Sequence, residues 1–141
     1  MHNAIPRDGV VVFAVPADAK EDIRIALNVF AHYVEEEFHV TENDIQLNLE
    51  SCDPEPVMPQ ITGKNLILAL QAVDNGTYSM CQDEALAWMV ETSSNIASVK
   101  TGEKTVEIVA SQRSNVTSNL ENMGNTVKAA FQLAGAEVVQ G

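Results

Sequence analysis

The sequence predicts an α+β fold, a ferredoxin-like two-layer sandwich in which two β-α-β units share one sheet with an inserted helix between them. Three observations predict it. A strand, helix, strand pattern occupies residues 9–49 and recurs over residues 105–139. A proline-rich segment and a short helical pattern separate the two units. A chain of 141 residues has room for one ordinary domain, so both units are expected in a single sheet.

The first β-α-β unit is predicted within residues 1–52. Residues 9–15 read GVVVFAV, a nearly continuous apolar run that is typical of a strand covered on both faces. Asp18 and Glu21 have the spacing of a capping box, so a helix is expected to begin at Asp18. Residues 45–49 then alternate between apolar and polar side chains, as in a half-buried strand. The apolar stripe of the helix consists of Ile23, Leu27, Phe30, Val34 and Phe38.

A loop and the inserted helix are predicted within residues 53–90. Three prolines fall within residues 53–61 and indicate a loop. Thr62 is expected to cap a helix over residues 63–74. Residues 77–90 are ambiguous, because Trp88, Met89 and Val90 could begin a strand or end a short helical turn. The inward-facing residues of the inserted helix are expected to be Leu66, Leu70 and Val73.

The last third, residues 91–141, opens with a predicted β-hairpin. Residues 91–99 are strand-like but polar, and the Thr-Gly-Glu run at 101–103 is typical of a hairpin turn. Residues 105–111 are the expected return strand. Its apolar face consists of Val106, Ile108 and Ala110.

A helix and a short final strand follow the hairpin. Ser118 and Glu121 have the spacing of a second capping box. Gly135 stands where a glycine is expected after the last helical residue. Residues 137–139 are predicted as the last strand. The apolar stripe of this helix consists of Leu120, Met123, Val127, Ala130 and Ala134.

Charge and hydropathy limit the partners. Eight basic residues against twenty acidic ones give a formal net charge of −12, which repels phosphate. We therefore expect no nucleic-acid partner and no membrane partner. The longest wholly apolar run, Val10–Val15, is far shorter than the roughly 20 residues of a spanning helix. No basic segment followed by an apolar one opens the chain, so no signal peptide is expected, and a cytoplasmic location is predicted.

Cysteine and histidine spacing does not indicate a metal site. Cys52 and Cys81 could form one disulfide, but two reduced thiols are expected in a cytosolic chain. Neither cysteine belongs to a C-x-x-C pair. His32 and His39 lack the i, i+4 spacing of helical metal ligands and are interpreted as surface histidines. We expect no metal ligands in this chain.

Two polar residues are candidate functional groups, although no nucleophile or phosphate-loop motif is present. Asn3 precedes the extended segment before Pro6 and could direct an amide donor at an oxyanion, or could be a turn asparagine. Arg113 lies between a strand and a helix. It could bind a carboxylate through two parallel hydrogen bonds, or could pair with one of the many surface carboxylates.

Three segments of the chain form a familiar set. The first segment is NAIPR at residues 3–7. The second is DNGTYSMCQDEALAWMVETSSNIASV at 74–99. The third is SQRSNVTSN at 111–119, followed by VKAAFQLAGAEV at 127–138. In their order and spacing, these segments together resemble the aminoacyl-histidine dipeptidases, the Xaa-His or PepD type of the zinc exopeptidase group that includes carnosinase and carboxypeptidase G. The resemblance covers nearly the whole chain.

The resemblance implies that this chain, residues 1–141, is a single lid domain fragment, the greater part of the lid of such an enzyme. Members of the family have a catalytic domain that binds two zinc ions and a lid domain inserted into it, and the zinc-ligand motifs are absent from this chain. The parent enzyme would hydrolyse Xaa-His dipeptides such as β-alanyl-histidine through a metal-activated water. The chain alone would not be catalytic.

The resemblance also implies roles for the two candidate residues. Asn3 matches an asparagine that contacts the substrate oxyanion. Arg113 is the best match for an arginine that binds the C-terminal carboxylate of the dipeptide. Some relatives carry that arginine on the strand after the asparagine, where this sequence has Phe13 to Pro16 and no arginine. Closure of the lid would exclude water from the site.

Two other hypotheses remain open at this stage. The chain could be a free-standing ferredoxin-like binding or oligomerisation module, or a small enzyme with an unrecognised site. The partners expected for a lid are the dipeptide substrate and the catalytic domain of the same protein. A homodimer formed through an exposed edge strand is a further expectation.

Overall fold

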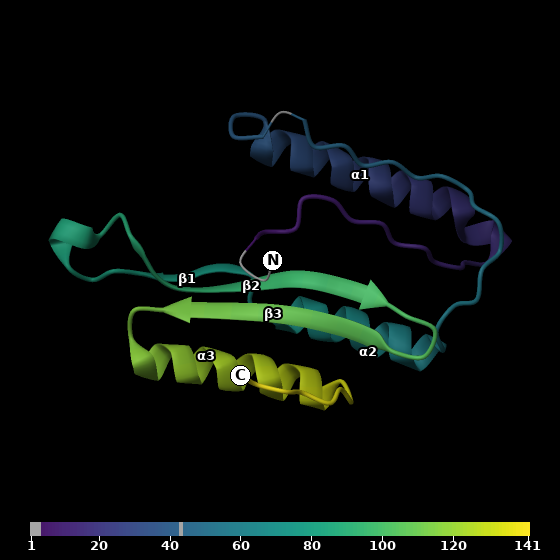
Figure 1. Ribbon diagram of the computed structural model, residues 1–141. Coiled ribbons are helices and arrows are strands. Elements are labelled where there is room, and N and C mark those ends of the chain that lie inside the picture. Colours follow the sequence, from purple (N-terminus) through teal and green to yellow (C-terminus); the bar gives the residue numbers. More distant parts are fainter. Residues whose placement is uncertain (1–3, 43) are drawn as a thin grey trace. The chain divides into compact units, whose positions relative to one another are not determined.

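The computed structural model describes residues 4–42 and 44–141. The chain forms two compact units, a smaller one over Val11–Val57 and a larger one that combines the N-terminal segment up to Val10 with Met58–Gly141. The elements in chain order are η1 (Ala17–Ala19), α1 (Lys20–Phe38), α2 (Gln60–Ala72), β1 (Gly76–Met80), η2 (Glu84–Leu86), β2 (Val90–Thr101), β3 (Val106–Ser114) and α3 (Thr117–Leu133) (Figure 1). The α+β class is confirmed. The division of the chain into residues 1–52, 53–90 and 91–141 remains a prediction.

The larger unit contains an antiparallel sheet in the order β1-β2-β3. The predicted hairpin is confirmed, with Thr101 opposite Val106 and the Gly102 N–H donating to the Thr105 carbonyl at 2.8 Å. In the ambiguous range 77–90, Val90 begins β2, and the helical turn η2 ends at Leu86, before Trp88. The sequence did not predict β1. Most of β1 lies at the start of this range, and the 3-10 turn η2 lies between β1 and β2.

The hydrophobic core lies between the sheet and the two helices α2 and α3, which appear beside the β2–β3 hairpin in Figure 1. Val73 is buried as predicted, whereas Leu66 and Leu70 are only half-buried. The predicted stripe of α3 is largely confirmed, but Leu120 is 38% exposed and Phe131, which the stripe omitted, is buried. The buried core residues are Ala69, Val73, Met123, Val127 and Phe131, and the sheet packs Ile96, Ile108 and Ala110 against them.

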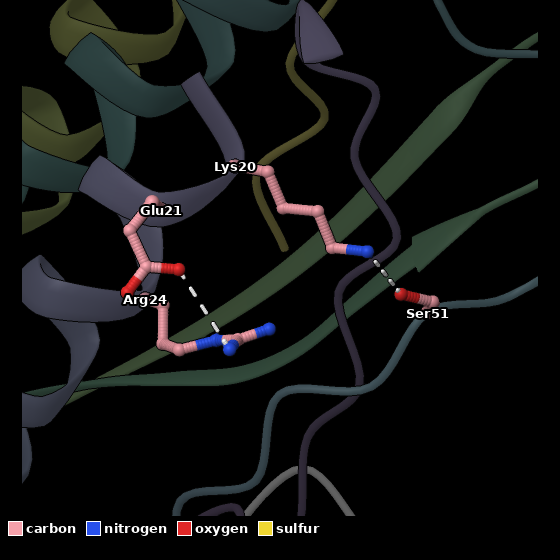
Figure 2. Close-up of polar contacts among 4 residues, drawn as sticks. All are labelled: Lys20, Glu21, Arg24 and Ser51. Carbon is pink, nitrogen blue, oxygen red and sulfur yellow. Dashed lines mark hydrogen bonds and ion pairs between the residues drawn. The ribbon is translucent and has the colours of Figure 1, made fainter. Parts of the chain in front are cut away.

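The smaller unit contains α1, which ends at Phe38, the last residue of the predicted stripe. Ile23, Leu27 and Val34 of that stripe are half-buried, as is Ala31, which the stripe omitted. Phe30 and Phe38 are exposed, so these two members of the predicted stripe are wrong. Figure 2 shows two polar contacts of its first turns. Lys20 Nζ donates to Ser51 Oγ at 3.0 Å, and Arg24 lies 3.7 Å from the Glu21 carboxylate.

Three predicted strands are absent from the structure. Residues 9–15, 45–49 and 137–139 contain neither helix nor strand. An apolar or alternating pattern indicates which side chains a strand would bury, but a strand also requires a neighbour to accept its backbone hydrogen bonds. No strand among the described residues pairs with these segments, and the Val11 side chain is 80% exposed.

The three predicted helix caps are also wrong. An N-cap residue must have a non-helical backbone conformation. Asp18 instead lies inside the 3-10 turn η1, and Glu21 pairs with Arg24. Thr62 lies inside α2, whose N-cap is Pro59, and Ser118 lies inside α3, whose N-cap is Val116. None of these helices has a side-chain hydrogen bond at its N-cap.

The glycine predicted after α3 is confirmed at Gly135, which has φ +85°. Its N–H donates to the Gln132 carbonyl at 2.9 Å, and the Ala136 N–H donates to the Phe131 carbonyl at 2.9 Å. These two bonds form a Schellman motif, which satisfies the last carbonyls of the helix.

Replacement of Gly135 by alanine should therefore destabilise the chain. A Cβ in this left-handed conformation costs about 1–2 kcal/mol, although the space around it is open. We expect a lower midpoint in thermal denaturation followed by circular dichroism. Gly9→Ala is the matched control, because Gly9 has open space and no positive φ. Equal midpoints for the two variants would contradict the prediction.

Candidate functional site

Arg113 lies on β3, directly opposite Ser93 of β2. The neighbours of Ser93 along β2, Thr92 and Ser94, are 1% and 2% exposed, on the face that packs against the helices. Because successive residues of a strand point to opposite faces, Ser93 and Arg113 point to the other face of the sheet. We call this the polar face, and it consists of Ser93, Asn95, Ser111 and Arg113.

The Arg113 side chain is available for a ligand. The residue is exposed, and within the described ranges it forms no ion pair with a carboxylate. The alternative interpretation, an arginine paired with a surface acid, therefore has no support among the described residues. An exposed guanidinium can bind a carboxylate through two parallel N–H donors.

The N-terminal segment reaches the same polar face. Asn95 Nδ2 donates to the Ala4 carbonyl at 3.0 Å, although the two residues are 91 positions apart. Asn95 lies opposite Ser111 and therefore diagonally across from Arg113. Asn3 directly precedes Ala4 in the sequence, but it lies outside the described residues, so its candidate role is untested.

A carboxylate that the sequence reasoning missed joins three elements at this end of the sheet. Glu91 is an extra residue in the pairing of β1 with β2, where Ser79 lies opposite Thr92 and Met80 lies opposite Val90. Such a bulge re-aims a side chain. The Glu91 Oε1 atom accepts hydrogen bonds from Asn119 at 2.8 Å, from Ser79 at 3.1 Å and from Thr92 at 3.4 Å.

The hydrogen bonds continue from Glu91 to the start of α3. Thr92 Oγ1 lies 2.8 Å from Ser114 Oγ, and Ser114 Oγ accepts the Val116 N–H at 3.0 Å. The Asn115 N–H donates to the Glu91 carbonyl at 3.1 Å. We call Ser79, Glu91, Thr92, Ser114 and Asn119 the Glu91 network. The stretch VETSSN at residues 90–95 belongs to the second segment that carries the resemblance, but nothing in it indicated which partners Glu91 would contact.

The described residues do not fit a metal centre. Among residues 4–42 and 44–141, no three histidine, cysteine, aspartate or glutamate side chains are placed to hold an ion. His32 Nε2 lies 3.5 Å from Glu36, and His39 Nδ1 lies 2.8 Å from the Glu36 carbonyl, so both contact their own helix or its end. Cys52 and Cys81 are free thiols. No helix of the described part is long and apolar enough to cross a bilayer.

Comparisons with known proteins identify relatives of this chain. No protein-family model matches it. Cytosol non-specific dipeptidase of Escherichia coli (strain K12) is 26% identical over 138 residues, which make up 97% of this chain and 28% of that protein. The crystal structure of aminoacylhistidine dipeptidase from Vibrio alginolyticus matches with a TM-score of 0.78 and 25% identity. That match covers 87% of this chain and 25% of that one.

These comparisons confirm the resemblance to the aminoacyl-histidine dipeptidases. The match in three dimensions is also consistent with a ferredoxin-like layout. This chain spans only about a quarter of either relative, 28% of one and 25% of the other. The chain is therefore homologous to part, and not to the whole, of these dipeptidases.

Proposed function

We propose that this chain is the substrate-covering lid domain of a metal-dependent dipeptidase that hydrolyses Xaa-His dipeptides of the β-alanyl-histidine class. The observation that carries the proposal is that nearly the whole chain, 97% of it, matches only 28% of a dipeptidase. In this proposal, zinc is held by a catalytic domain of the same cytoplasmic protein, and the chain alone does not catalyse hydrolysis. The name of the Vibrio alginolyticus relative, aminoacylhistidine dipeptidase, supports the substrate class.

The proposed role of Arg113 is to bind the C-terminal carboxylate of the dipeptide. Its exposure on the polar face and its lack of an ion pair within the described ranges support this role. Ser93 lies directly opposite on β2 and adds a hydroxyl group to the same face. A carboxylate bound there would position the dipeptide for attack elsewhere in the protein.

The proposed role of Asn3 is to donate a hydrogen bond to the oxyanion that forms during hydrolysis. The bond between Asn95 and the Ala4 carbonyl supports it, because it attaches the N-terminal segment to the face that carries Arg113. In a dipeptide, only the amide nitrogen and one Cα separate the scissile carbonyl carbon from the terminal carboxylate carbon. Two protein groups a few ångströms apart could therefore contact both.

A free-standing binding or oligomerisation module is the second candidate, favoured by one observation. In the strand order β1-β2-β3, β3 is an edge strand, and its outer edge pairs with no strand among the described residues. Such an edge can pair with a second copy of the chain. The possible homodimer belongs to this candidate as well as to the lid.

Sequencing the source DNA on both sides of this reading frame separates the two candidates. The lid proposal predicts that sense codons continue in both directions and encode histidine and acidic zinc-ligand motifs. A ribosome-binding site before Met1 together with a stop codon after Gly141 would overturn it. The free-standing module would then be the better proposal.

A further inference from the structure

We propose that Glu91 is a positioning residue that holds Arg113 in the geometry needed to bind the substrate carboxylate. The inference rests on the proposed function, and it assigns a role to a residue that does not itself contact the substrate. Glu91 is suited to the role because its carboxylate connects three elements. It accepts hydrogen bonds from β1, from its own strand β2, and from α3, the helix that follows Arg113.

The direction of the hydrogen bonds supports the inference. A carboxylate only accepts, so Thr92 must donate its single hydroxyl proton to Glu91. Thr92 Oγ1 can then only accept from Ser114 Oγ, which in turn accepts from the Val116 N–H. The hydroxyls of Thr92 and Ser114 therefore each donate one hydrogen bond and accept one. The Glu91 carboxylate fixes which atom of each bond is the donor.

The hydrogen bonds that run from Glu91 through Thr92 end at Ser114, beside Arg113. Ser114 is the next residue along β3, and the Asn115 N–H is bonded to the Glu91 carbonyl. Asn119, on the first turns of α3, is bonded to the Glu91 carboxylate. The segment on the C-terminal side of Arg113 is thus attached to Glu91 at three places, through the Asn115 N–H, the Asn119 side chain and, by way of Thr92, the Ser114 hydroxyl. The Asn115 bond goes to the main-chain carbonyl, and the other two attachments depend on the Glu91 carboxylate. Thr92 is 1% exposed, so water cannot readily replace the lost contacts.

The test is a kinetic comparison in the protein encoded by the complete reading frame, with β-alanyl-histidine and its C-terminal amide as substrates. Glu91→Ala should raise the KM for the free dipeptide about tenfold, because small misplacements of a binding group have large effects. The KM for the amide should change much less, and so should kcat. Glu91→Gln should restore most of the preference for the free dipeptide, because Gln keeps an acceptor oxygen at the same place.

A double variant shows whether Glu91 acts through Arg113. If Glu91 acts only through Arg113, adding Glu91→Ala to Arg113→Ala should cause no further loss of the preference for the free dipeptide. Glu107→Ala is the matched control, because Glu107 is an exposed glutamate at the other end of the same hairpin, opposite Lys100. Gly135→Ala is the control for a general loss of stability, and it should leave the discrimination unchanged.

Failure of the inference and failure of the proposed function give different results. If Arg113→Ala reduces the discrimination but Glu91→Ala does not, the positioning role of Glu91 is overturned while the lid remains. If Gly135→Ala reduces it as much as Glu91→Ala, the effect is general instability and the inference is also overturned. If Arg113→Ala has no effect, or the protein hydrolyses neither substrate, the proposed function fails and the inference fails with it.

Discussion

Arg113→Ala, made in the complete protein, should raise the KM for free Xaa-His dipeptides about 10- to 100-fold. Hydrogen bonds to a charged group contribute about 1.5–3 kcal/mol, and each 1.4 kcal/mol is a factor of ten in affinity. The same change should affect dipeptides with an amidated C-terminus much less, because these substrates lack the carboxylate. Steady-state kinetics with β-alanyl-histidine and its amide measures the difference.

Two further variants make this test specific. Arg113→Lys keeps the charge but cannot form two parallel hydrogen bonds, so it should restore only part of the lost affinity. Arg24→Ala removes an arginine from α1 whose side chain is 55% exposed and pairs with Glu21, and it should leave both KM values unchanged. Equal losses on the free and amidated substrates after Arg113→Ala would remove Arg113 from carboxylate binding.

Asn3→Ala should lower kcat about 10²- to 10³-fold, the usual loss when one oxyanion donor is removed. If the amide contacts the oxyanion and not the ground-state carbonyl, KM should change little. The measurement is kcat for β-alanyl-histidine at saturating substrate in the complete protein.

The control for this variant is Asn125→Ala, which removes an exposed asparagine from α3 in the same larger unit. Asn95→Ala gives a second comparison, because it removes the donor to the Ala4 carbonyl and leaves Asn3 itself in place. A kcat for Asn3→Ala equal to that of Asn125→Ala would remove Asn3 from the mechanism.

The local sequence pattern correctly predicted the elements that depend mainly on residues close to them in the sequence. The hairpin between residues 91 and 111 was predicted because its turn residues and both strands are contiguous. The end of α3 just before Gly135 was predicted because a positive φ favours glycine and the apolar stripe repeats at helical spacing. Both are confirmed in the structure, apart from shifts of a few residues at the strand ends.

The predictions that failed depended on partners that the sequence does not identify. The runs at 9–15 and 45–49 have the side-chain pattern of strands, but no described strand accepts their backbone hydrogen bonds. Ser118 and Glu121 have the spacing of a capping box, yet the start of α3 is stabilised from outside the helix. Ser114 accepts the Val116 N–H, and Glu91 accepts from Asn119.

The sequence by itself determined the α+β class, the hairpin, the C-terminal end of α3, the net charge of −12, and the resemblance that the comparisons confirm. It also selected Arg113 as a candidate, from its place between a strand and a helix. Only the tertiary structure decided which face of the sheet carries Arg113, and that Asn95 attaches Ala4 to that face. The same is true of the contacts between Glu91 and the start of α3. These features depend on strand register, on one bulge and on side chains from distant segments, and no local pattern specifies them.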